Sequence, residues 1–160
     1  MTIFHSKIIA FDPGTTKSGI AVMQRNNDGK INVLFYDKLV AKGPDAIQRC
    51  WDIKEQFKKV YAGYKPDIVV VEYPQVISAE GRFAAARNSG RITVLFHLCG
   101  MIHALVGKKF EHYTPTKWKG NVPKHITAKR VFKHYEIIAS EDEMDAIALG
   151  DWYLKRSNGE

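Results

Sequence analysis

Short apolar runs along the chain predict the strands of a buried sheet. The segment Ile8–Phe11 is apolar throughout, and Ile68–Glu72 is apolar up to its final residue, which is typical of strands covered on both faces. Ser18–Gln24 and Ile31–Leu39 predict two further strands, because the turn sequence Asp28-Gly29 between them favours a hairpin. We therefore expect the chain to open with an antiparallel meander of three strands.

The longer segments between these runs show helical periodicity. Asp45–Tyr61 places most of its apolar residues on one stripe. Phe83–Val106 predicts a long helix that is apolar over its second half, and Thr127–Ile138 predicts a basic amphipathic helix. The spacing Ser140-x-x-Glu143 is that of a capping box and predicts the start of a last helix. The stripe of the first helix consists of Ile47, Cys50, Trp51, Ile53, Phe57 and Val60.

The order of these elements predicts an α/β fold. With a short strand at Phe110–Tyr113, the chain runs through three strands, a helix, a strand, a helix, a strand and two helices. A helix between two strands implies a crossover, so we expect Ile68–Val71 to lie parallel to Ile8–Phe11. The sequence thus predicts a mixed five-stranded sheet flanked by helices on both faces, with loops at 73–82 and 120–125.

The composition suits an intracellular protein that binds a polyanion. The 160 residues match the usual size of one domain, which we assign to residues 1–156, with residues 157–160 as a disordered tail. A net charge of +7 suits nucleic acid but does not establish it. Cys50 and Cys99 lie in apolar helical patterns and are expected to be free thiols. Because we find no signal-peptide pattern and no apolar run of transmembrane length, we expect a cytoplasmic protein without a membrane partner.

Four carboxylates stand where the predicted elements would gather them. Asp12 directly follows Ile8–Phe11, and Glu72 ends the other apolar strand. Asp142 and Asp145 are three residues apart on one face of the last helix, whose dipole favours ionised carboxylates near its start. Acids that meet at one edge of a sheet repel one another unless cations neutralise them. The four acids therefore predict a site for Mg²⁺.

Each acid also has an ordinary structural interpretation. Asp142 and Asp145 by themselves suit the negatively charged start of any helix. Asp12 alone suits a turn, and Glu72 alone suits a polar strand end. An acid that ends an otherwise apolar strand is less ordinary, and here it occurs twice. Taken together, the four acids favour the metal site.

Basic residues cluster in the second half of the chain. Between Gly107 and His134 there are eight Lys and Arg residues and one acid, which suits an enzyme that grips a phosphate backbone and hydrolyses it with metal ions. Arg82, Arg87 and Arg91 form another basic group, for which a solvated helix face is an equally good interpretation. Trp118 and Tyr135 interleave with the lysines and either stack on bases or pack in the core. The expected DNA-binding residues are Arg82, Arg87, Lys117, Lys119, Lys124, Lys129 and Arg130.

These residues resemble the motifs of RuvC-type Holliday junction resolvases, within the RNase H-like superfamily. Phe11-Asp12-Pro13-Gly14 followed by Ser18-Gly19-Ile20-Ala21-Val22 is similar to the family's first motif, and Val71-Glu72 to its second acidic motif. Asp142-x-x-Asp145-Ala146 resembles the final paired-acid motif. The segment from Ala85 to Arg91 and the apolar helix after it resemble the family's dimer-forming helix. Thr114-Pro115-x-x-Trp118-Lys119-Gly120 is similar to the segment with its phosphate-contacting residues.

The resemblance spans almost the whole chain and implies both a fold and an activity. The fold is RNase H-like, and the protein is a homodimer that makes paired incisions in four-way DNA junctions during DNA recombination and repair. Lys119 is a catalytic residue beside the acids, and Lys129 is a further basic contact. The segment after Glu72 lacks an obvious aromatic at the family's wedge position, which leaves Tyr73 or Phe83 for that role. Two Mg²⁺ ions per active site, for which Mn²⁺ substitutes, are held by Asp12, Glu72, Asp142 and Asp145, with Asp12 bridging both.

Other functions are also compatible with these residues. A nuclease of the same superfamily that acts on flaps, other branched DNA or structured RNA would share the four acids. Residues 12–19 resemble the phosphate loop of actin, sugar-kinase and heat-shock-chaperone ATPases, but those proteins need two such domains and give no role to Asp142 and Asp145. A protein that binds junctions without cutting them has no need of all four acids. Small resolvases also occur in phages, in which case the enzyme acts in the host cytoplasm.

Overall fold

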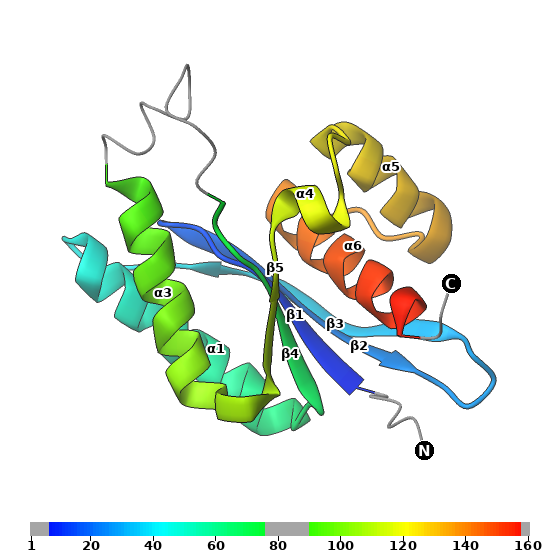
Figure 1. The fold of residues 1–160 in the computed structure, drawn as a ribbon, viewed down its shortest axis with the longest axis horizontal. Helices are drawn as coiled ribbons and strands as arrows, with labels where there is room; N and C mark the ends of the chain where they lie inside the picture. The colour runs from blue at the N-terminus through cyan, green and yellow to red at the C-terminus, as the bar shows by residue number, and fades with distance from the viewer. Residues whose placement is uncertain (1–6, 76–89, 158–160) are drawn as a thin grey trace.

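A mixed five-stranded sheet runs through the centre of the molecule (Figure 1). The computed structural model describes residues 7–75 and 90–157. The strands are β1 (Lys7–Asp12), β2 (Lys17–Arg25), β3 (Ile31–Val40), β4 (Ile68–Glu72) and β5 (Phe110–Tyr113). Their order is β3-β2-β1-β4-β5, with β1 to β3 antiparallel and β4 parallel to both β1 and β5. The predicted meander and the predicted crossover are both confirmed.

Helices cover both faces of this sheet, as predicted. They are α1 (Ala46–Tyr64), α3 (Arg91–Val106), α4 (Pro115–Trp118), α5 (Lys124–Tyr135) and α6 (Glu141–Arg156), with a 3₁₀ turn, η1, at Gly107–Lys109. α1 and α3 lie on one face, α6 lies on the other, and α5 packs on α6 (Figure 1). The residues expected to form a disordered tail lie outside the described residues, except for Ser157.

Alternate residues of β1 supply two separate layers of the core. Ile8 and Ala10 pack against α6, whereas Ile9 and Phe11 face α1 and α3, and none of the four has exposed surface. Phe57 of α1 meets Phe11 edge-on, with the ring centroids 5.2 Å apart. Because both faces of β1 are covered, its sequence is uniformly apolar rather than alternating.

The apolar stripe predicted for α1 is too wide. Its buried members are Cys50, Ile53 and Phe57. Ile47 and Trp51 are 59% and 58% exposed, so this prediction is wrong for both residues. They lie one turn apart on the solvent side of the helix, where the Nζ of Lys54 sits 3.5 Å from the centre of the Trp51 ring. Periodicity alone does not show where the edge of a buried stripe falls.

The basic helix α5 begins and ends three residues earlier than the sequence predicts. It starts at Lys124, directly after Pro123, and ends at Tyr135. Pro123 suits the start of a helix because its fixed φ and missing N–H cost nothing there. Glu136 follows with a left-handed φ of 57°, which stops the helix. The loop predicted at 120–125 is correspondingly shorter, so Lys124 belongs to a helix.

The described part of the predicted long helix is α3, which starts after Gly90, and residues 83–89 lie outside the described residues. Its sheet-facing residues are Leu98, Cys99, Ile102 and Val106. The segment Arg91–Lys109 contains an 18-residue window with a mean hydropathy of 1.2, of which 22% is buried. By length and composition alone it could cross a membrane, so the expectation that no run reaches this length is wrong. Core helices of soluble proteins pass the same test.

Candidate active site

Neighbouring strands bring Asp12 and Glu72 to the same edge of the sheet. Phe11 pairs with Val71 in the parallel register of β1 and β4, so the two acids that follow these residues lie side by side. Glu72 in turn pairs with Tyr113 of β5. The sheet therefore delivers both carboxylates to one edge, as the two apolar runs predict.

The first turns of α6 place the second pair of acids at this edge. The backbone N–H of Ser140 donates to Oε2 of Glu143 at 2.8 Å, as part of the predicted capping box. Asp142 and Asp145 follow in the helix, and Asp145 is only 3% exposed. Gly19 of β2 permits this approach, because a Cβ at that position would overlap the carbonyl oxygen of Asp142.

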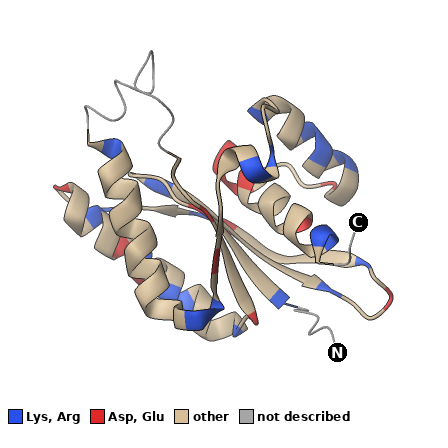
Figure 2. Cartoon of the chain, in the orientation of Figure 1, with Lys and Arg blue, Asp and Glu red and all other residues tan. Residues whose placement is uncertain are grey.

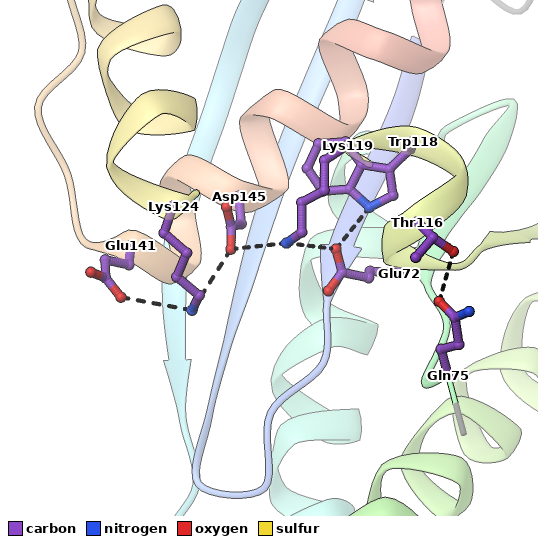
Figure 3. A network of polar contacts seen from close by, with 8 residues as sticks. All are labelled: Glu72, Gln75, Thr116, Trp118, Lys119, Lys124, Glu141 and Asp145. Carbon is purple, nitrogen blue, oxygen red and sulfur yellow. Dashed lines mark hydrogen bonds and ion pairs between the residues drawn. The ribbon is translucent and has the colours of Figure 1, made fainter. Parts of the chain in front are cut away.

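Lys119 lies between the two groups of acids (Figure 3). Its Nζ is 3.3 Å from Oε2 of Glu72 and 3.6 Å from Oδ2 of Asp145. All three side chains are largely buried, with exposed fractions of 15% for Lys119 and Glu72 and 4% for Asp145. The short helix α4, which begins at Pro115, carries Lys119 from the end of β5 to this position. The predicted catalytic lysine is therefore in direct contact with predicted metal ligands.

Lys124 extends the network toward solvent (Figure 3). Its Nζ lies 3.8 Å from Oδ2 of Asp145 and 3.7 Å from Oε2 of Glu141. The side chain is 54% exposed, so these contacts contribute little to stability. The sequence predicts Lys124 as a DNA contact but gives no sign of this bridge, because the bridge depends on how α5 docks against α6.

Burial and the neighbouring charges raise the pKa of two of the acids, Asp12 and Asp145. Burial first, and then the charges of Glu72 and Asp145, raise the pKa of Asp12 well above its usual value. Burial also raises the pKa of Asp145, although Lys119 and Lys124 oppose this shift. Burial lowers the pKa of Lys119, but the surrounding carboxylates outweigh it and the pKa rises. The ammonium group of Lys119 is therefore held in its charged form beside acids that still repel one another.

Trp118 is a member of this site that the sequence analysis did not assign. Its indole Nε1 donates to Oε2 of Glu72 at 2.7 Å, the same oxygen that Lys119 contacts. The side chain is 9% exposed and packs in the core beneath α6. A buried indole N–H needs a hydrogen-bond acceptor. The sequence signal for this role was therefore a tryptophan directly before a candidate catalytic lysine.

The chemistry of the donor set fits a divalent cation such as Mg²⁺. In the part of the chain that the structure describes, no three His, Cys, Asp or Glu side chains converge as the ligands of a metal ion do. An ammonium group, that of Lys119, instead lies between Glu72 and Asp145. The four predicted ligands are nevertheless all carboxylates, and Asp142 is close enough to raise the pKa of Asp12. Oxygen ligands with excess negative charge are what Mg²⁺ and Mn²⁺ bind.

The other predicted DNA-binding residues are exposed on α4 and α5 or lie outside the described residues. Lys117 is exposed on α4, and Lys129 and Arg130 are exposed on α5. Figure 2 shows blue basic positions along α5 and red acidic positions near the start of α6. Arg82 and Arg87 lie outside the described residues, so they stay predictions.

The aromatic residues considered for DNA contacts are engaged in packing. Tyr73 lies against Phe96 and His112, with ring centroids 5.2 and 4.7 Å away. The hydroxyl of Tyr135 donates to Asp151. Phe83, the other candidate wedge residue, lies outside the described residues. Tyr73 is thus tied to α3 and β5 in this conformation of the protein.

Two hydrogen bonds between Gly14 and Ser18 close the turn after Asp12. The backbone N–H of Gly14 donates to Oγ of Ser18 at 2.9 Å, and this hydroxyl donates back to the carbonyl oxygen of Gly14 at 3.4 Å. Ser18 has no exposed surface. Its hydroxyl therefore supports the turn, whereas a phosphate loop would present such a group to its ligand.

Known proteins are similar to this chain over nearly its whole length. No family model matches the chain. The crossover junction endodeoxyribonuclease RuvC of Dictyoglomus turgidum is 26% identical over 162 residues, covering 95% of this chain and 98% of that protein. Among solved structures, T. thermophilus RuvC in complex with a Holliday junction substrate has a TM-score of 0.74 at 19% identity, with 97% of both chains covered. The resemblance to RuvC-type resolvases is confirmed.

The RuvC-like fold extends to more distant relatives. The yeast mitochondrial Holliday junction resolvase Ydc2 has a TM-score of 0.69 at 11% identity, and the match covers 99% of this chain and 83% of that one. The mixed sheet with helices on both faces is thus the RNase H-like fold that the sequence predicts. RuvC-type resolvases in general are metal-dependent nucleases, and the cluster of acids lies in a chain of that fold.

Proposed function

We propose that this chain is an endonuclease that resolves four-way DNA junctions by paired phosphodiester hydrolysis with divalent metal ions. The observation that carries the proposal is the gathering of Asp12, Glu72 and Asp145 around Lys119, at one sheet edge of a RuvC-like fold. RuvC of Dictyoglomus turgidum, which bears the name of this activity, matches the chain over nearly its whole length. The enzyme would serve DNA recombination and repair in the cytoplasm, which is the host's if a phage encodes it.

The four acids would hold two Mg²⁺ ions, or Mn²⁺ in their place. Asp12 lies close enough to the other three acids for each of them to raise its pKa, so the four carboxylates would hold the ions together. The predicted ligands are Asp12, Glu72, Asp142 and Asp145. When bound, the ions supply activation of the attacking water and stabilisation of the leaving oxygen.

The neighbouring side chains of the protein position the acids and the phosphate. Trp118 and Lys119 both hold Oε2 of Glu72, which restricts this carboxylate to one orientation. Lys119 keeps its positive charge and lies close enough to the acids to contact a phosphate bound there. Lys124, at the exposed rim, would meet the DNA backbone next to the cut. The wider basic surface, Lys117, Lys129 and Arg130, would bind the adjoining phosphates.

A second copy of the chain would cover the free side of α3. This helix has exposed positions at His97, Gly100 and Ala104, and 22% of its most apolar window is buried. Two active sites are needed for paired incisions, so a homodimer fits the proposed reaction. Ala104→Glu should give a monomer in sedimentation velocity, whereas Ala62→Glu, on the exposed side of α1, should leave the dimer intact.

Cleavage of an end-labelled four-way junction in Mg²⁺ tests the proposal. We expect symmetric paired nicks, lost on addition of EDTA and in Asp12→Asn. A flap and a structured RNA are tested in the same assay. Faster cutting of either one would show that the chain is one of the related nucleases and that the junction is not its preferred substrate. Tight junction binding without Mg²⁺-dependent cutting would overturn the enzymatic assignment. Binding of ATP in calorimetry would instead favour the phosphate-loop alternative.

A further inference from the structure

A groove lies between α5 and α6 and is lined by residues of both helices. Its volume is about 650 Å³, which is within the usual range of sites for small organic ligands. Trp118 and Lys119 belong to its lining and also contact Glu72. From there the lining follows α6 as far as Arg156, a distance of roughly 12 Å along the helix axis from Ala148. Trp118 and Lys119 thus lie between the groove and the acids and belong to both.

The lining of the groove is positively charged. Arg130 and Lys133 of α5 line it together with Lys155 and Arg156 of α6. Among the lining residues that the structure describes, Asp151 is the one acid, and it is already paired. Its Oδ2 accepts from Nζ of Lys155 at 2.7 Å, and its other oxygen accepts from the hydroxyl of Tyr135. An anion that enters the groove would meet cations without an opposing free carboxylate.

Flat side chains lie next to these charges. Trp152 and Tyr135 line the groove, and both are partly exposed. The guanidinium carbon of Arg156 lies over the Trp152 ring, 5.3 Å from its centre, and Tyr113 packs against the same ring with centroids 5.0 Å apart, so a cation and an aromatic ring lie side by side in the lining. Such a pairing is how proteins bind single-stranded nucleic acid: the aromatic ring stacks on a base and the cation contacts the backbone.

We propose that this groove binds an unpaired nucleotide of the DNA strand next to the cut phosphate. The inference rests on the proposed function, because the groove adjoins the acids through Trp118 and Lys119. A base inside a duplex has both faces covered by its neighbours, so only an unstacked base can offer a face to Trp152. Strands that exchange at a junction can supply such a nucleotide. The protein would thus bind the substrate where its strands are unpaired, in addition to binding its duplex arms.

Binding of a short single-stranded oligonucleotide tests the groove without any cutting. A fluorescein-labelled thymidine tetranucleotide is titrated in EDTA at low ionic strength, and its fluorescence anisotropy gives the dissociation constant. Lys133→Gln and Trp152→Leu alter the groove, and each has a control on the opposite face of the sheet. Lys59→Gln removes a similarly exposed charge from α1, and Trp51→Leu removes its exposed tryptophan.

We expect Trp152→Leu to weaken binding about tenfold, and Lys133→Gln to weaken it by a smaller factor at low salt. The two control variants should bind as the wild type does. Lys133 is exposed, so Lys133→Gln tests the groove even if Trp152→Leu fails to fold. Equal affinities for the groove and control variants would overturn the inference. Equally tight competition by thymidine monophosphate would overturn the assignment to a DNA strand.

Cleavage of the four-way junction by the wild type separates this inference from the proposed function. If the wild type cuts the junction but Lys133→Gln and Trp152→Leu bind the tetranucleotide normally, the groove inference alone fails. If the groove variants lose tetranucleotide binding while the wild type cuts no junction, the proposed function fails. The groove would in that case be a single-strand site of a different nucleic-acid-binding protein.

Discussion

The indole N–H of Trp118 donates to the same oxygen of Glu72 that the ammonium group of Lys119 contacts, at 2.7 and 3.3 Å respectively. The two donors are consecutive in the chain, and both point at the same carboxylate oxygen (Figure 3). Residues that orient a metal ligand commonly contribute to metal affinity and activity almost as much as the ligand itself. Glu72 is thus held in place by a neutral donor and a charged one.

Trp118→Phe should raise the Mg²⁺ concentration needed for half-maximal junction cleavage about tenfold. The phenyl ring fills most of the indole's space but cannot donate to Glu72, so the carboxylate gains freedom to rotate. The measurement is the rate of cleavage as a function of Mg²⁺. Trp51→Phe is the matched control, because Trp51 is exposed on α1. An unchanged Mg²⁺ dependence in Trp118→Phe would show that the hydrogen bond does not position the ligand.

Asp12→Asn should abolish cutting and stabilise the metal-free protein. The raised pKa of Asp12 means that the folded state holds this proton more tightly than the unfolded state does. Stability from this group is therefore present at low pH and is lost as pH rises above its ordinary value of 3.8. The asparagine removes this loss because it carries no charge.

Thermal unfolding in EDTA at several pH values checks the effect of Asp12→Asn. The melting temperature of the variant minus that of the wild type should be small near pH 4 and grow toward neutral pH. Each kcal/mol corresponds to roughly 2–4 °C for a chain of this size. Saturating Mg²⁺ should shrink or reverse the difference, since the ion stabilises the wild type by binding its folded form. A difference that does not change with pH would mean that Asp12 carries no such repulsion.

Lys119→Met should lower the melting temperature of the metal-free protein more than Lys124→Met does. Lys119 is 15% exposed and touches two acids, whereas Lys124 is 54% exposed. Removing one partner of a buried charge network costs about 3 kcal/mol or more, while an exposed partner is worth well below that. Melting curves in EDTA compare the two variants directly. Equal shifts would contradict the central position of Lys119.

Gly19→Ala should lose both stability and cleavage activity. A Cβ at Gly19 would overlap the carbonyl oxygen of Asp142, so the start of α6 has to move away from the sheet. That movement carries Asp142 and Asp145 away from Asp12, which pairs with Gly19 across the β1–β2 ladder. Melting temperature and junction cleavage are the two measurements.

Gly63→Ala is the control for this substitution. Gly63 lies in α1, and a Cβ there meets nothing within 4 Å. An alanine at this exposed position in the last turn of α1 should stabilise the fold by at most about 0.5–1 kcal/mol relative to glycine, with no change in cleavage. If Gly19→Ala behaves like Gly63→Ala, the close approach of β2 to α6 is not required for the site.

The sequence by itself determined the strands, the start of the last helix and the acids. Strands covered on both faces must be apolar at every position, so Ile8–Phe11 and Ile68–Glu72 were recognisable, as were the acids next to them. The capping box at Ser140 fixed where the last helix starts, because its signal lies within four residues of the chain. Predictions that depend on local patterns of this kind agree with the structure.

The tertiary structure decided which of these groups meet. Lys119, Glu72 and Asp145 are far apart in the sequence, and their contacts depend on how α4 and α6 dock at the sheet edge. The exposure of Trp51, the hydrogen bond of Trp118 to Glu72 and the groove between α5 and α6 follow from the same docking. Periodicity records that a helix has an apolar side, but side-chain contacts between distant segments depend on packing in three dimensions.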